Sequence, residues 1–346
     1  MSDVEAATLD PSIAPTPRRS WKRQAITLGS VLFSVLLLVE LYRTVNLGKV
    51  GEALLGADRL WLAVSVGMIV PITFFRALRF YWVAPRGSLP GVWEAFRLTV
   101  VASALNVFAP AKAGDLVKSY FIATRTTTPP GVALSIVVYE RLCDLFGLIA
   151  WCVLGWIVGR PHIDGIGRPF WLTLAVLGAV CFVLIASELA ARGLRRVVDW
   201  VLPRGRLNSF HKLADGWPGL LEVLHGRRRW IVSYSLMLWL THLFQIWLFT
   251  VALTVAIPFT VCASLSAVAL MAGQLPFTFA GLGSRDVVLV VLLAHYMAPA
   301  EAAAMGVLIA TRQLLPPLLG LPFTRPYLSS VVEDARQWRA RLRDAR

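Results

Sequence analysis

Long apolar stretches dominate this sequence and restrict the chain to folds that a lipid bilayer surrounds. A spanning helix needs about 20 mostly apolar residues. Because 57% of the residues are hydrophobic and only 16% are charged, the chain lacks the polar surface of a soluble globular protein. The sequence therefore predicts an all-α polytopic membrane protein with about six full spans. These spans cover about 24–42, 60–83, 131–159, 169–191, 230–257 and 300–323.

The ends of the chain differ in composition from its middle. Residues 1–23 are polar, Pro-rich and then basic, which predicts a disordered cytoplasmic head. The apolar run that follows is too long for a signal-peptide core and lacks a small-residue cleavage site, so we expect a retained span. We expect a single transmembrane domain over residues 24–325 and a cytoplasmic tail over residues 326–346.

Two further regions, about 92–124 and 259–298, are apolar but interrupted by Pro, Gly and polar residues. Pro and Gly end helices, and each remaining piece is too short for a full span. We therefore expect two re-entrant hairpins of broken helices, or eight spans in all if the hairpins are counted. The breaks lie at Asn106–Asp115, Gln274–Pro276 and Gly281–Asp286.

The distribution of Lys and Arg predicts the orientation. With the N-terminus inside and both hairpins re-entrant, cytoplasmic segments hold 20 of the 34 cations, outer loops hold 5 and membrane segments hold 9. This bias follows the positive-inside rule and places both termini in the cytoplasm. The net charge of +14 is thereby explained by membrane topology, which disfavours nucleic acid as a partner.

The order of elements predicts an inverted repeat. In each proposed repeat a span, a hairpin and a second span follow one another, and every direction is reversed in the second repeat. The interval from Asp115 to Arg141 is 26 residues, and the same interval separates Asp286 from Arg312. Inverted repeats with broken helices near the midplane recur in transporters. The two repeats span about 60–159 and 230–323.

Several polar and charged residues lie where lipid or protein interior is expected. A charge at the centre of a span costs about 2.5–3.5 kcal/mol, so these residues must meet one another, water or a ligand. Arg76 and Arg79 lie near the inner end of their span and could instead snorkel to the interface. The candidate ligand-binding residues are Arg76, Arg79, Asn106, Lys112, Asp115, Lys118, Glu140, Arg141, Asp144, Gln274, Arg285, Asp286 and Arg312.

Structural roles are the alternative for other members of this set. Arg141 and Asp144 are three residues apart and could neutralise each other on one helix face. Asp115 and Asp286 each precede a short helix and could cap its free N–H groups. Arg312 has no acid nearby in its own span, so it requires a partner from another element.

The charges of the set predict the chemistry of a ligand. Seven cations stand against four acids, and a surplus of guanidinium donors suits a phosphate group. The apolar surroundings suit acyl or isoprenoid chains. No cofactor is expected, because the four cysteines and five histidines show no metal-ligand spacing.

Four segments carry a family resemblance: 75–79, Asn106–Lys118, Tyr139–Asp144 and Gly281–Asp286. They resemble the lysylphosphatidylglycerol synthase transmembrane-region family, also called flippase-like domain proteins, over about residues 25–325. The departures are mild. The last residue of the fourth segment is Asp where the family usually has Glu, and the second segment has Pro-Ala-Lys-Ala-Gly where Pro-Gly-Arg-x-Gly is common.

The resemblance implies a bacterial or archaeal membrane protein that moves lipids between leaflets or assists glycolipid and hopanoid pathways. For this chain it implies a multi-pass protein of the bacterial cytoplasmic (inner) membrane. Fused members carry a soluble aminoacyl-transferase domain after the membrane region. Only about 20 polar residues follow Pro326 here, so we do not expect lysyl transfer to lipid.

Three functions remain open at this point. The first is a transporter that binds an anionic phospholipid or a polyprenyl-phosphate-linked glycolipid in a midplane cavity and is not an enzyme. The second is a membrane-embedded transferase that acts on a lipid carrier, for which the first outer loop offers only Glu52 and Asp58 as acids. The third is an accessory subunit that partners a pathway enzyme of lipid or glycan synthesis.

Overall fold

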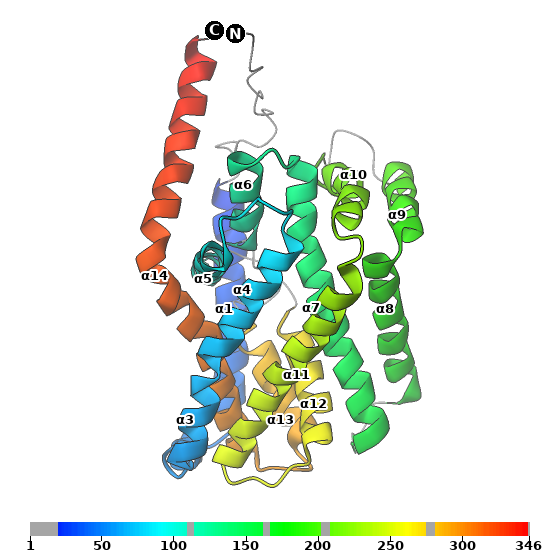
Figure 1. The fold of residues 1–346 in the computed structure, drawn as a ribbon. Coiled ribbons are helices and arrows are strands. Elements are labelled where there is room, and N and C mark those ends of the chain that lie inside the picture. The colour runs from blue at the N-terminus through cyan, green and yellow to red at the C-terminus, as the bar shows by residue number, and fades with distance from the viewer. Residues whose placement is uncertain (1–19, 109–113, 162–166, 202–207, 275–280, 345–346) are drawn as a thin grey trace.

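The computed structural model describes residues 20–108, 114–161, 167–201, 208–274 and 281–344, and these residues form a bundle of α-helices (Figure 1). The helices are α1 (Ser20–Thr44), α2 (Leu47–Leu55), α3 (Arg59–Gly67), α4 (Ile69–Val83), α5 (Val92–Phe108), α6 (Leu116–Arg125), α7 (Pro130–Gly159), α8 (Arg168–Ala186), α9 (Glu188–Val201), α10 (Asn208–Val223), α11 (Arg228–Ala252), α12 (Phe259–Ala272), α13 (Ser284–Leu293) and α14 (Pro299–Asp344).

The described helices confirm a helical polytopic membrane protein. Five segments are long and apolar enough to cross a bilayer, namely α3 with α4, α7, α8, α11 and the first part of α14, and α1 with α2 forms a sixth candidate that is bent by 87°. Two predicted spans were too long at their ends. The span predicted over 169–191 stops at Ala186, where Ser187 leaves the helix, and the span predicted over 230–257 stops at Ala252.

Short polar and proline residues produce the breaks near the start of the bundle. The side chain of Asn46 accepts hydrogen bonds from the first amides of α2, at 2.9 Å from Gly48 N, and so fixes the bend after α1. Within the predicted span 60–83, Pro71 lacks an N–H group and its ring opposes the carbonyl four residues earlier. The helix is accordingly interrupted at Met68, between α3 and α4.

The two broken regions lie toward opposite ends of the bundle. Figure 1 places α6 at the upper end, near α10, and places α12 and α13 at the lower end. A separate hydrophobic core surrounds each region: one contains residues of α5, α6 and α10, and the other contains residues of α2, α8, α12 and α13. Helices α7, α8, α11 and α14 contribute to both cores, so they connect the two ends of the bundle.

The last helix bends along its length (Figure 1). Four prolines lie inside α14, at positions 316, 317, 322 and 326, and each removes a backbone hydrogen bond and opposes the preceding turn. The bent helix packs against α5, where Tyr327 donates a hydrogen bond of 2.6 Å to Glu94. The first hairpin is therefore held against α14 as well as against α7.

Candidate functional site

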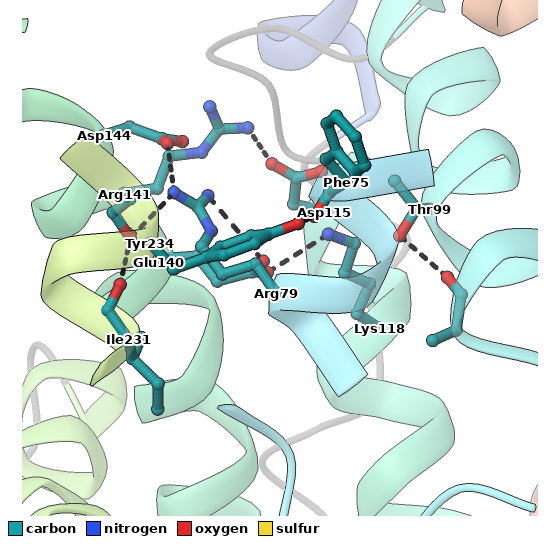
Figure 2. Close-up of polar contacts among 12 residues, drawn as sticks. Phe75, Arg79, Thr99, Asp115, Lys118, Glu140, Arg141, Asp144, Ile231 and Tyr234 are labelled. Atoms are coloured by element: carbon teal, nitrogen blue, oxygen red, sulfur yellow. Dashed lines mark hydrogen bonds and ion pairs between the residues drawn. The ribbon is translucent and has the colours of Figure 1, made fainter. Parts of the chain in front are cut away.

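A buried cluster of charged side chains joins α4, α6 and α7 (Figure 2). Arg79 of α4 extends its guanidinium group between two acids of α7. Its Nη1 atom lies 2.7 Å from Asp144 Oδ1, and its Nη2 atom lies 3.9 Å from Glu140 Oε1. Lys118 of α6 reaches the same Glu140, with 3.1 Å between Nζ and Oε2. Arg79 therefore does not snorkel to the membrane interface, because it is bound on both sides inside the bundle.

Helix periodicity explains how α7 presents these acids together. Glu140 and Asp144 are four residues apart and so share one face of the helix. That face meets α11, where Trp239 Nε1 donates a hydrogen bond of 3.1 Å to Asp144. Ser235, one turn earlier on α11, lies 3.4 Å from Arg79 Nη1. The cluster thus receives neutral hydrogen-bond donors and acceptors from a fourth helix.

Arg141 connects α7 to the first hairpin. Its guanidinium group forms an ion pair with Asp115, and Asn106 Nδ2 donates a hydrogen bond of 3.1 Å to the same carboxylate. Two alternatives from the sequence are therefore wrong. Arg141 and Asp144 do not neutralise each other, and the side chain of Asp115 makes no capping hydrogen bond to α6.

Gly114 allows this part of the hairpin to close. A Cβ atom at position 114 would lie 2.5 Å from Asn106 N and 2.6 Å from Ala102 O, which are backbone atoms of α5. Only glycine permits that approach without moving α5. The Gly-Asp pair of the motif therefore combines a close backbone contact with the carboxylate that Arg141 binds.

The second hairpin contains a different arrangement. Arg285 binds the carboxylate of the next residue, Asp286, with 2.5 Å from Nη2 to Oδ1, and Nη2 also donates to Gly306 O of α14 at 3.1 Å. The other oxygen of Asp286 accepts from Gly283 N at 3.0 Å, which confirms the capping alternative for this residue. Gly283 has φ 88° and the nearby Gly281 has φ 77°, a backbone region that favours glycine.

The aspartates of the two hairpins therefore form ion pairs with arginines at different positions. Asp115 is preceded by Gly114 and pairs with Arg141 of the following span. Asp286 is preceded by Arg285, which binds it directly. Arg312, at the position that matches Arg141 by interval, is left to contact His242 of α11 through its Nη2 atom. The second hairpin thus has an arginine next to its aspartate where the first hairpin has Gly114.

The remaining predicted residues do not join the ion pairs. Arg76, on α4, forms no ion pair with another described residue. Gln274 follows α12 and makes a backbone hydrogen bond to Met271 O, without a side-chain bond to any described residue. Lys112 lies outside the described residues. The charged groups of the first hairpin are thus brought together, whereas those of the second form a separate pair.

Sequence reasoning missed three residues of α11: Ser235, Trp239 and His242. They lie at intervals of four and three residues and share a helix face. That face is polar within a very apolar span, and this pattern was the available signal. Arg312 needed a partner from another span, so a histidine on this face of α11 could have been predicted as that partner.

The positions of Glu52 and Asp58 give little support to the transferase alternative. Asp58 caps α3, with 2.8 Å from its Oδ1 atom to Leu60 N, and Glu52 is an exposed residue of α2. Among the described residues, no three or more His, Cys, Asp or Glu side chains are grouped as a metal site would require. All four cysteines are buried and free.

Comparisons with known proteins agree with the motifs. The sequence profile of the family described as "Lysylphosphatidylglycerol synthase TM region" matches residues 26–320. A UPF0104 membrane protein of Methanocaldococcus jannaschii is 20% identical over 315 residues, which is 85% of this chain and 94% of the relative. A UPF0104 membrane protein of Methanothermobacter thermautotrophicus is 22% identical over 305 residues, or 82% of this chain and 88% of the relative.

Proposed function

Because the chain belongs to the family of lysylphosphatidylglycerol synthase transmembrane regions, we propose that it translocates an anionic lipid across the cytoplasmic membrane. The lipid is an anionic phospholipid or a polyprenyl-phosphate-linked glycolipid. Its phosphate group binds among the charged residues within the bundle, and its apolar chains remain among the helices or in the bilayer.

One observation carries this proposal: the charges inside the bundle do not balance. Ion pairs use all four candidate acids, and the pairs are Arg79 with Asp144, Lys118 with Glu140, Arg141 with Asp115, and Arg285 with Asp286. Two arginines, Arg76 and Arg312, form no ion pair with a carboxylate among the described residues. A lasting surplus of positive charge in a bilayer is costly, and an anionic ligand removes that cost.

Movement of the lipid is proposed to follow from an inverted repeat over about 60–159 and 230–323. The two broken regions at opposite ends of the bundle (Figure 1) support this arrangement, as do the separate cores around them. The Asp115–Arg141 pair closes the first hairpin against α7. Opening this pair would give the phosphate access to Arg141, and rocking one repeat against the other would alternate access between the leaflets.

The proposed orientation predicts which side of the membrane reaches each loop. When one cysteine at a time is introduced into the native chain, Arg86→Cys and Ala340→Cys should react with a membrane-impermeant thiol reagent only from the cytoplasmic side. Glu52→Cys should react only from the outside. The four native cysteines are buried, so background labelling should be low. Labelling of position 340 from the outside would contradict the proposed topology.

Translocation is tested with the purified protein in liposomes that carry a trace of fluorescent phosphatidylglycerol. An impermeant reductant quenches only the outer leaflet, so protein-dependent movement appears as quenching beyond about half of the fluorescence. We expect this extra quenching with phosphatidylglycerol or with a labelled polyprenyl phosphate, and less of it with a labelled phosphatidylcholine, which carries no net charge. Movement of neither anionic probe, relative to protein-free liposomes, would contradict the proposal.

A further inference from the structure

The contact between Arg312 and His242 specifies the protonation state of the histidine. Arginine remains protonated in proteins and only donates hydrogen bonds. Because Arg312 Nη2 contacts His242 Nδ1, this nitrogen must be the acceptor. His242 is therefore neutral in this structure, and its one ring proton is on Nε2.

Cationic side chains outnumber acids around His242. Arg312 faces it from α14, Arg76 and Arg79 act on it from α4, and the one acid that acts on it is Asp144 of α7. Asp144 already accepts from Arg79 and from Trp239, whose ring lies 4.9 Å from the imidazole. A protonated His242 would thus meet three cations and a single carboxylate that is already engaged.

The two arginines that form no ion pair with a described carboxylate, Arg76 and Arg312, are each partly buried and keep some exposed surface. Arg285 and, to a smaller extent, Arg76 lie close enough to Arg312 to repel its charge. An anion bound to Arg76 and Arg312 would relieve repulsion between these two groups and would compete with His242 Nδ1 for the N–H groups of Arg312.

We propose that Arg76 and Arg312 bind the phosphodiester of an anionic lipid, and that His242 takes up one proton from water when the phosphate displaces it from Arg312. The Nδ1 lone pair that accepted from Arg312 receives this proton. The imidazolium then donates a hydrogen bond to the phosphate. This inference rests on the proposed lipid translocation and adds the residues that hold the phosphate and a coupling between lipid binding and protons. Binding of the lipid and protonation of His242 are linked. Protonation of His242 therefore raises the affinity for lipid by the same factor by which bound lipid raises the affinity of His242 for the proton, so lower pH tightens lipid binding.

The experiment measures binding of phosphatidylglycerol to the detergent-solubilised full chain by titration calorimetry. A phosphodiester keeps its single charge between about pH 5.5 and about pH 8, so a change in affinity across the range in which histidine titrates reports on the protein. We expect binding to tighten about tenfold toward the acid end. Titrations in two buffers of different ionisation enthalpy should show uptake of close to one proton per lipid.

Variants assign the proton to His242. His242→Asn and His242→Gln should bind lipid without proton uptake and with little pH dependence. His225→Asn is the matched control, because His225 also contacts an arginine, with Nδ1 3.1 Å from Arg228 Nη2, but lies exposed at the end of the bundle. It should retain the wild-type pH dependence. Arg312→Gln should weaken binding at least about tenfold at every pH.

Three results would overturn the inference. The first is equal proton uptake in the wild type and both His242 variants, and the second is absence of phosphatidylglycerol binding at any pH. The third is tighter binding of glycerophosphoglycerol, which is the same head group without acyl chains. The outcome is separable from that of the proposed function. Proton-linked binding without translocation leaves the phosphate site in place and refutes transport, whereas translocation with pH-independent binding refutes only the role of His242.

Discussion

Replacing Arg79 with glutamine should lower the free energy of unfolding by about 3–5 kcal/mol. Arg79 is 2% exposed and is the ion-pair partner of Asp144. Glutamine can still donate a hydrogen bond, but it leaves the carboxylate of Asp144 without its ion-pair partner in the interior of the bundle. The cost is large because an uncompensated buried charge loses its hydration and gains no ionic partner.

Unfolding of the purified protein in mixed micelles with increasing denaturing detergent measures this change. Arg43→Gln is the matched control, since Arg43 forms an ion pair with Glu40 in which both side chains are largely exposed, at 74% and 68%. It should change stability by less than about 1 kcal/mol. Adding Asp144→Asn to Arg79→Gln should recover part of the loss, because the uncompensated acid is then absent. Equal stabilities of Arg79→Gln and Arg43→Gln would show that the ion pair is not important for the fold.

Replacing both Arg141 and Arg312 with glutamine should abolish lipid translocation and weaken retention of anionic lipid at least about a hundredfold. Each change removes a cation with some exposed surface, and 30% of the Arg141 side chain is exposed. Each guanidinium group can contribute a charge-assisted hydrogen bond to phosphate. With both groups replaced, the acid Asp115 loses its partner and repels an approaching anion.

Native mass spectrometry of co-purified lipid measures retention, and the liposome assay measures movement. A double variant of two exposed arginines, Arg43→Gln with Arg59→Gln, removes the same formal charge from the outer segments and should behave as the wild type. Thermal unfolding of both double variants separates loss of the ligand from loss of the fold. Full lipid retention by a folded Arg141→Gln, Arg312→Gln variant would remove the basis of the proposed site.

Local patterns in the sequence were sufficient to predict the helical elements. Transfer of an apolar residue from water to lipid depends on that residue and its neighbours, so five spanning helices and the bent sixth candidate could be found from hydropathy. Helix periodicity likewise placed Glu140 and Asp144 on one face. The ends of helices were less accurate: α8 stops at Ala186, and residues 188–191, which the predicted span included, belong to α9.

The sequence also identified the charges that had to be compensated, but not their partners. Arg141 is a cation only three residues from Asp144 in the sequence. The ion-pair partner of Asp144 is nevertheless Arg79, which is 65 positions away. Arg312 contacts His242 across 70 positions. Such choices depend on which helix faces meet, and no local periodicity contains that information.

By itself, then, the sequence determined that this chain is a helical membrane protein with buried charges near two broken helices. The tertiary structure decided that Asp115 binds Arg141 while Asp286 binds Arg285, and that Arg76 and Arg312 form no ion pair with an acid among the described residues. The physical reason is that hydrophobic transfer acts on each segment separately. Pairing of buried charges instead requires a particular distance and direction between side chains, and only the packing of the helices supplies both.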